Sequence, residues 1–194
     1  MENLENCLKK RLPHLDIRPL AQSFSITKRL KKNEFLVRPG QQSAFVAYVS
    51  TGAFRVFYDN EEHQEITTWF SFQNAFVTDL LAYYKETPAT FYIQALEDSQ
   101  VLIAPKKDLE ELYLREAKLQ AFGRQFAENG MVLVMERMMS LQCKTATMRY
   151  LELLEQPQFL RKIPLKHLAS YLGVTDSSLS RIRRNLSASK DKPA

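Results

Sequence analysis

Three polar residues near the end of the chain have types and a spacing that suit contact with nucleic acid. They are Ser177, Arg181 and Arg184, and at 100° per residue they share one side of a predicted helix. The apolar positions of that helix fall on the opposite side; they are Leu179, Ile182 and Leu186. An Arg side chain can donate two hydrogen bonds to guanine O6 and N7, and Ser can bond base edges or phosphate. The pattern therefore predicts a DNA-reading face.

The residues of this face are expected to divide the work. We expect Arg181, with Ser180 beside it, to read bases, while Arg183 and Arg184 neutralise phosphates. The helix N-terminus around Ser177 could bind a further phosphate through backbone N–H groups. The full predicted DNA-binding set is Thr175, Ser177, Ser178, Ser180, Arg181 and Arg184.

Two helices joined by a tight turn must position this face. Pro164 suits the start of the first helix, small Ala169 permits a close crossing, and Gly173 can adopt the left-handed conformation that ends a helix. Thr175 is a good N-cap, and Asp176 suits the positive end of the helix dipole. The second helix should then run to about residue 186.

The charge of the chain is concentrated in the same region. Residues 142–194 hold ten Lys and Arg against four Asp and Glu, whereas residues 1–141 hold 17 against 18. The whole excess of the net charge of +5 therefore lies in the last quarter. Such an excess favours a polyanionic partner, although an ordinary solvated basic surface has the same composition.

The segment from 25 to 104 has the texture of an antiparallel β structure. Short runs rich in β-branched and aromatic residues alternate with turn signals such as Pro39-Gly40, Thr51-Gly52 and Asp59-Asn60. The predicted strands are 35–37, 45–50, 53–58, 65–70, 90–95 and 100–104. Many short strands at close intervals indicate a barrel or roll, preceded by short helices in the first two dozen residues.

Beyond Pro105 the pattern becomes helical and stays so to about residue 155. A 3-4 alternation makes a stripe suited to coiled-coil contact with a second copy of the chain. The predicted dimer residues on it are Leu119, Phe122, Phe126 and Leu133. The alternative is that the stripe packs on the chain's own strands. The dimer is favoured because Met131 to Met139 make the helix apolar on more than one side.

The run Tyr-Leu-Gly-Val-Thr at 171–175, followed by Ser-Leu-Ser-Arg-Ile at 178–182, resembles the helix-turn-helix of the cyclic-AMP receptor protein/Fnr family. The resemblance extends over nearly the whole chain. It implies an α+β fold: an N-terminal antiparallel β-roll (double-stranded β-helix) flanked by helices, a long dimerisation helix and a C-terminal helix-turn-helix. The expected divisions are 1–105 for the sensor domain, 106–141 for the long helix and 142–194 for the DNA-binding domain.

The same resemblance implies the partners. They are double-stranded DNA with an inverted repeat, a second copy of the chain, and RNA polymerase as a further candidate contact. Two departures from the family pattern concern the DNA end: Ser177 stands where the family usually has Glu, and only a polar tail, 187–194, follows the predicted recognition helix. We therefore expect the β-hairpin wing of the family to be absent or minimal.

An effector site is also implied by the resemblance, and here the sequence departs further. Family members that bind cyclic nucleotide present Gly-Glu to the ribose and, ten residues later, Arg-Ser to the phosphate. The corresponding residues are Thr78-Asp79 and Ala89-Thr90, so the phosphate-binding Arg is missing. We expect cyclic AMP to bind weakly or not at all, and the roll to take another effector or none.

Other classes of function find little support. Cys7 and Cys143 lie far apart, His14, His63 and His167 are isolated, and no catalytic spacing or phosphate loop is present, so neither a metal site, a cofactor nor an enzyme is expected. The apolar runs are too short to span a membrane, and the residues after Met1 do not resemble a secretory signal, which predicts a cytoplasmic location. A ligand-sensing adaptor without specific DNA binding remains the alternative.

Overall fold

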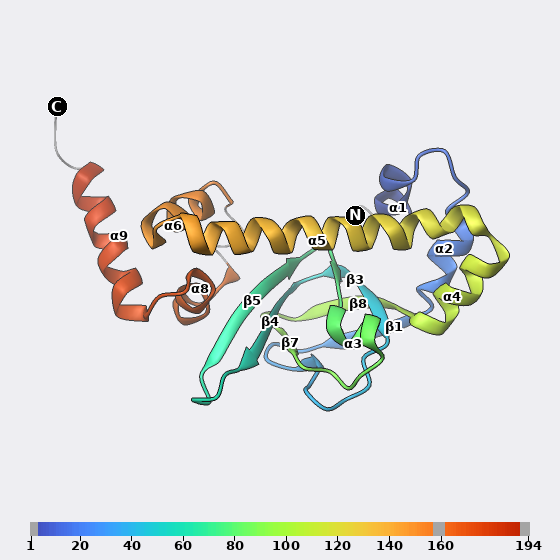
Figure 1. Ribbon diagram of the computed structural model, residues 1–194, viewed down its shortest axis with the longest axis horizontal. Helices are drawn as coiled ribbons and strands as arrows, with labels where there is room; N and C mark the ends of the chain where they lie inside the picture. Colours follow the sequence, from blue (N-terminus) through green and yellow to red (C-terminus); the bar gives the residue numbers. More distant parts are fainter. Residues whose placement is uncertain (1–3, 157–161, 191–194) are drawn as a thin grey trace.

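A computed structural model describes residues 4–156 and 162–190. Its longest element, α5 (Gln120–Cys143), runs along one side of a β-roll (Figure 1). Helices α1 (Leu4–Arg11), α2 (Arg18–Ser23) and α4 (Lys106–Arg115) gather at one end of α5. Helices α6 (Ala146–Leu154), α8 (Leu165–Leu172) and α9 (Asp176–Lys190) gather at the other. The predicted α+β fold is confirmed.

The roll consists of two four-stranded antiparallel sheets. One has the order β1 (Ile26–Leu30), β8 (Ser99–Pro105), β3 (Phe45–Thr51), β6 (Phe76–Val77). The other has the order β2 (Phe35–Val37), β7 (Tyr92–Ala95), β4 (Ala53–Asp59), β5 (Glu65–Phe72). Alternate residues such as Phe54 and Val56 point between the sheets and form their common core. A short helix, α3 (Leu80–Lys85), follows β6.

The helical segment expected from 106 to 141 is divided. Helix α4 ends at Arg115, a 3-10 turn spans Ala117–Leu119, and only then does α5 begin. The break lies at Glu116, whose φ of −129° and ψ of 77° are not helical. The turn lets Leu112 of α4 and Leu119 pack into one core with α1 and α2, which a single straight helix would prevent.

The predicted dimer stripe proves to be largely internal. Leu119 and Phe122 are 2% and 3% exposed, and Phe126 packs against the same core of the chain. The ring of Phe76 on β6 lies 5.4 Å from that of Phe122 and 6.2 Å from that of Phe126. Leu119 and Phe122 are therefore inside the chain's own core, and half-buried Phe126 packs beside them on the roll. Only Leu133, further along the helix, is exposed.

The C-terminal helices share a core with the roll. Leu168 and Leu172 of α8 and Leu179 of α9 are buried together with Ala53 and Phe70 of the second sheet. Helix α9 continues to Lys190, so the first part of the expected polar tail is helical, and residues 191–194 lie outside the described residues. Within the described ranges, none of the helices combines the length and apolar content that a membrane crossing requires.

Helix α8 lies beside a buried charge on the outer face of this sheet. Arg55 of β4, which is 1% exposed, donates to Glu65 Oε2 at 2.6 Å and to Thr67 Oγ1 at 2.8 Å, both on β5. His167 of α8 lies in the field of Arg55, Glu65 and two further charged residues of its own helical unit, Lys166 and Asp176. Burial, and secondly the charge of Arg55, lowers the pKa of His167 to about 4.

This shift predicts how stability depends on pH. An unfolded His has a pKa of about 6.5, so between about pH 6.5 and 4 the unfolded chain binds a proton at His167 that the folded chain does not. Stability should fall as the pH drops through that window. The full shift corresponds to about 2 kcal/mol between pH 7.5 and 5, and solvent screening at the half-buried side chain reduces it. In urea unfolding at these two pH values, His167→Gln should therefore lose roughly 1 kcal/mol less than the wild type. His14→Gln, at an exposed position, is the control. Equal losses in wild type and His167→Gln would contradict the assignment.

Candidate nucleic-acid interface

The turn between α8 and α9 sets where the predicted reading face lies. Gly173 ends α8 with φ 69°, in the left-handed region that glycine adopts without strain. Thr175 caps α9, because its Oγ1 accepts the Ser178 N–H at 3.2 Å. The hydroxyls of Ser177 and Ser178 each lie 3.0 Å from the same Oγ1. The hydrogen bonds between Thr175 and Ser178 therefore stabilise the N-terminus of α9.

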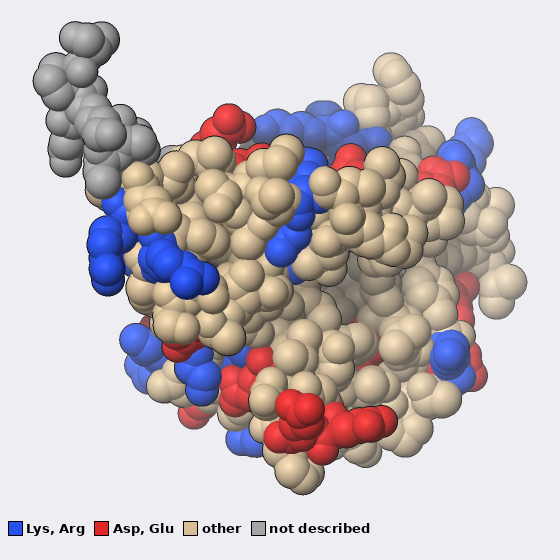
Figure 2. Space-filling view, turned by 60° about the vertical axis from the view of Figure 1, so that its left-hand side comes forward, with Lys and Arg blue, Asp and Glu red and all other residues tan. Residues whose placement is uncertain are grey.

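The reading face itself is exposed to solvent. Ser177, Arg181 and Arg184 are exposed, as is Arg183, whereas Ser178 and Ser180 are half-buried. Among the residues that the structure describes, none of the three arginines of α9 forms an ion pair. Figure 2, which brings the side with α9 forward, shows several groups of basic side chains at the left and an acidic group lower down. The guanidinium groups are thus available to a polyanion.

Two arginines that sequence reasoning did not place at this site hold α8 by its C-terminal carbonyls. The Arg137 guanidinium of α5 donates to Tyr171 O and lies 3.9 Å from the centre of the Tyr171 ring. Arg149 of α6 donates to Leu172 O at 2.8 Å and to Lys144 O at the end of α5. Cations suit the negative end of the helix dipole. The orphan carbonyls of helix ends are the signal that calls for such donors, but their partners are distant in sequence.

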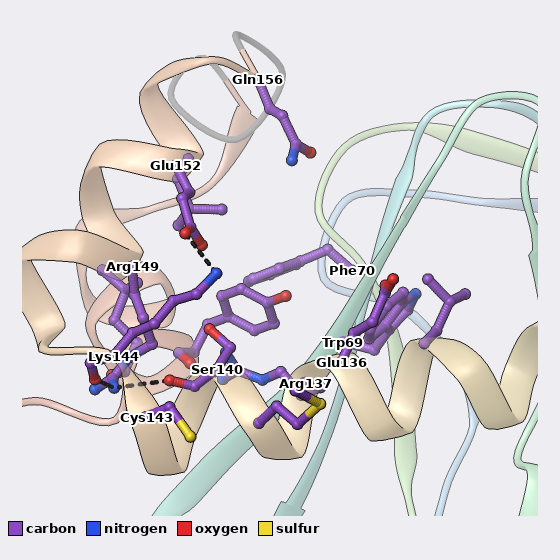
Figure 3. A pocket seen from close by; sticks show the side chains of 15 residues that line it. Trp69, Phe70, Glu136, Arg137, Ser140, Cys143, Lys144, Arg149, Glu152 and Gln156 are labelled. Atoms are coloured by element: carbon purple, nitrogen blue, oxygen red, sulfur yellow. Dashed lines mark hydrogen bonds and ion pairs between the residues drawn. The ribbon is translucent and has the colours of Figure 1, made fainter.

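These contacts line a cleft of about 550 Å³ between β5, α5, α6 and α8 (Figure 3). Trp69, Phe70 and Tyr171 form much of its apolar lining. Its cations already have partners: Arg137 and Arg149 bond backbone carbonyls, and Lys144 forms an ion pair of 2.5 Å with Glu152. The cleft is therefore a joint between parts of the chain whose polar groups are largely satisfied internally.

The four residues predicted for an effector come together, but they bond to the protein. Asp79 is 1% exposed, and its carboxylate accepts the N–H groups of Ala82 at 3.1 Å, Thr90 at 2.8 Å and Phe91 at 3.0 Å. Thr78 Oγ1 donates to Phe45 O at 2.6 Å. Ala89 is buried, and its backbone N–H and carbonyl groups bond residues of the loop between β2 and β3. None of the four lines the cleft of Figure 3.

The Asp79 carboxylate closes the loop between α3 and β7 from within, because it caps α3 and accepts the two successive N–H groups that precede β7. An anion already occupies these donors. Groups of three or more His, Cys, Asp or Glu side chains suited to a metal ion are not found within the described ranges.

Comparisons with known proteins agree with this architecture. Residues 27–116 match the family model of the cyclic nucleotide-binding domain. A search of curated proteins found no match. Among solved structures, a transcriptional regulator assigned to the crp/fnr family, from Eubacterium rectale, has a TM-score of 0.71 at 17% identity, covering 92% of this chain and 86% of its own.

Two further solved structures are similar over most of their length. FixK2 from Bradyrhizobium japonicum has a TM-score of 0.70 at 18% identity, covering 85% of each chain. The c-di-GMP responsive global regulator CLP from Xanthomonas campestris has a TM-score of 0.68 at 15% identity, covering 92% of this chain and 95% of its own. At such identities the likeness concerns the fold. The chain therefore has the fold of cyclic-AMP receptor protein/Fnr regulators, as its sequence resemblance predicted, and its residues 27–116 are similar to the cyclic nucleotide-binding domain.

Proposed function

We propose that this protein is a DNA-binding transcription regulator that inserts α9 into the major groove. The observation that carries the proposal is the exposed, unpaired arginine face of α9, held on a firmly anchored α8. Arg181 reads bases, Arg183 and Arg184 contact phosphates, and the N-terminus of α9 at Ser177 adds backbone donors. Thr175 and Ser178 support that N-terminus, and half-buried Ser180 lies beside the reading position.

We further propose that the protein acts as a homodimer through the side of α5 that faces away from the roll. Ala127, Met131, Val134, Met138 and Leu141 follow a 4-3-4-3 spacing, which is the seam of a coiled coil. The last four are 62%, 59%, 49% and 44% exposed. This seam replaces the predicted stripe of Leu119, Phe122, Phe126 and Leu133. Paired recognition helices then read two half-sites about one DNA turn, ~34 Å, apart.

For the roll we propose a regulatory role without a cyclic nucleotide. The support is that Asp79 occupies the backbone donors at Thr90 and Phe91, and that no Arg stands at Ala89. That the roll takes another effector or none, and that RNA polymerase is a further contact, stay predictions of the resemblance. The cytoplasmic location and the lack of enzymatic activity stay predictions from the sequence.

Replacing Arg181 tests the DNA-binding role. With duplexes selected by the wild-type protein from random sequence, Arg181→Ala should bind at least tenfold more weakly in fluorescence anisotropy, because a bidentate base contact contributes about 1 to 3 kcal/mol. Arg29→Ala on β1 removes an equal charge and should bind like the wild type. Equal affinity of Arg181→Ala and wild type would favour the adaptor alternative instead.

The seam is tested by charge. Val134→Glu combined with Met138→Glu should give a monomer in light scattering at micromolar concentration, because four carboxylates would meet across the two-fold axis. The far-UV circular dichroism should be unchanged, since both side chains are exposed within one chain. Met148→Glu, at an exposed position on α6, should remain a dimer. A monomeric wild type, or a dimeric double variant, would rule out the seam.

Because the residues predicted for an effector bond to the protein itself, we expect no response to cyclic nucleotide. Calorimetric titration of the wild type with cyclic AMP to millimolar concentration should show no binding. Asp79→Ala should lose about 2 to 4 kcal/mol of unfolding free energy, because one buried and two partly buried N–H groups lose their acceptor. Micromolar binding of cyclic AMP to the wild type would disprove the proposal for the roll.

A further inference from the structure

The last turn of α8 is tied to three different elements by three successive residues. Ser170 contacts β5, the carbonyl of Tyr171 accepts from Arg137 on α5, and the carbonyl of Leu172 accepts from Arg149 on α6. Arg137 and Arg149 act on backbone atoms near the dimer helix. Of the three, Ser170 is the residue whose side chain forms hydrogen bonds with the roll.

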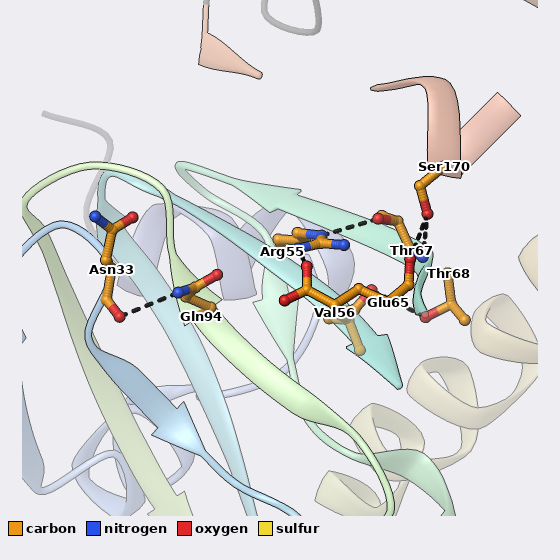
Figure 4. Close-up of polar contacts among 8 residues, drawn as sticks. All are labelled: Asn33, Arg55, Val56, Glu65, Thr67, Thr68, Gln94 and Ser170. Atoms are coloured by element: carbon orange, nitrogen blue, oxygen red, sulfur yellow. Dashed lines mark hydrogen bonds and ion pairs between the residues drawn. The ribbon is translucent and has the colours of Figure 1, made fainter. Parts of the chain in front are cut away.

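Ser170 occupies the open edge of the second sheet. Strand β5 pairs with β4 on one side only, so its other edge presents unpaired backbone groups. The Ser170 hydroxyl accepts the Thr67 N–H at 2.9 Å and donates to Glu65 O at 2.9 Å (Figure 4). One side chain thus takes the place of a neighbouring strand at this point.

The residues that Ser170 contacts also hold the buried Arg55. The side chains of Glu65 and Thr67 accept from the Arg55 guanidinium, while their backbone groups bond Ser170 (Figure 4). The ring of Phe70, further along β5, lies 5.3 Å from that of Tyr171. Polar and apolar contacts therefore both fix α8 on one stretch of one strand.

This docking leaves the reading face of α9 uncovered. Leu179 points into the core that α8 shares with the roll, whereas Arg181 and Arg184 are exposed. The turn that leads from α8 to α9 is fixed to α8, because Gly173 N–H and Val174 N–H bond back to Ser170 O and Ala169 O. The contact with β5 therefore orients the recognition helix and does not cover it.

We propose that Ser170 is a positioning residue: its bonds to the edge of β5 fix the DNA-binding helices on the roll and so set the orientation of α9. The part of this inference that concerns DNA rests on the proposed function. If the protein acts as the proposed regulator, the edge of β5 is the surface through which the roll controls DNA affinity.

The test compares Ser170→Ala with Thr68→Val in the full chain. Thr68 is also a hydroxyl residue at β5, but its bond goes to Val56 O within the sheet. In Ser170→Ala, amide exchange of residues 65–70 and 165–172 should be at least fivefold faster, and DNA affinity should fall three- to tenfold. The slope of affinity against salt concentration should not change, because the phosphate contacts remain. Ser170→Thr, which keeps a hydroxyl, should have the amide exchange and the DNA affinity of the wild type.

Several outcomes would overturn the inference. Unchanged exchange in Ser170→Ala would show that the hydroxyl does not hold the helices. Faster exchange with unchanged DNA affinity would show that docking does not position α9, and higher affinity would make the contact inhibitory. If the wild type binds no DNA, the proposed function and the DNA part of this inference fail together, and the exchange comparison alone decides whether Ser170 holds α8 on the roll.

Discussion

A buried guanidinium on the outer face of a sheet is the constraint on which the arrangement of this protein depends. Arg55 is out of contact with solvent, and an unpaired charge in such a place is very costly. Glu65 and Thr67 supply the pairing. Helix α8 packs over the same stretch of β5, so the roll and the C-terminal helices meet directly over this paired charge. Separating them would expose apolar core and the edge of a strand at once.

Local signals made much of the fold predictable. The strand runs, the glycine that ends α8 and the Thr175 cap all depend on neighbours within a few residues, and the structure has them where the sequence indicated. The break at Glu116 was not predictable in this way, because neither Gly nor Pro marks it and the packing of Leu112 and Leu119 on distant helices decides it.

The two faces of α5 illustrate a deeper limit. Phe122, Phe126 and Leu133 on one side and Met131, Val134 and Met138 on the other have the same periodicity, so spacing alone cannot tell which side meets the roll. The larger aromatic residues fill the space beside Phe76, and the methionine side remains exposed. Asp79 is a similar case. Its place in the sequence suggested a contact with an effector, but its carboxylate accepts N–H groups eleven and twelve residues away.

One helix therefore connects two requirements that a dimeric DNA-binding protein must satisfy together. The seam we propose on α5 fixes the position of the two-fold axis, and Arg137, on the roll-facing side of the same helix, fixes α8. Ser170 then fixes α8 to the roll. The orientation of α9, which follows α8, is therefore restrained both by α5 and by β5. In the proposed dimer the two half-sites lie at a fixed spacing, so both points of attachment have to hold α9 in place for its contacts with DNA to form. In the regulator we propose, a small displacement at the joint between α5, α8 and β5 would be carried to both recognition helices.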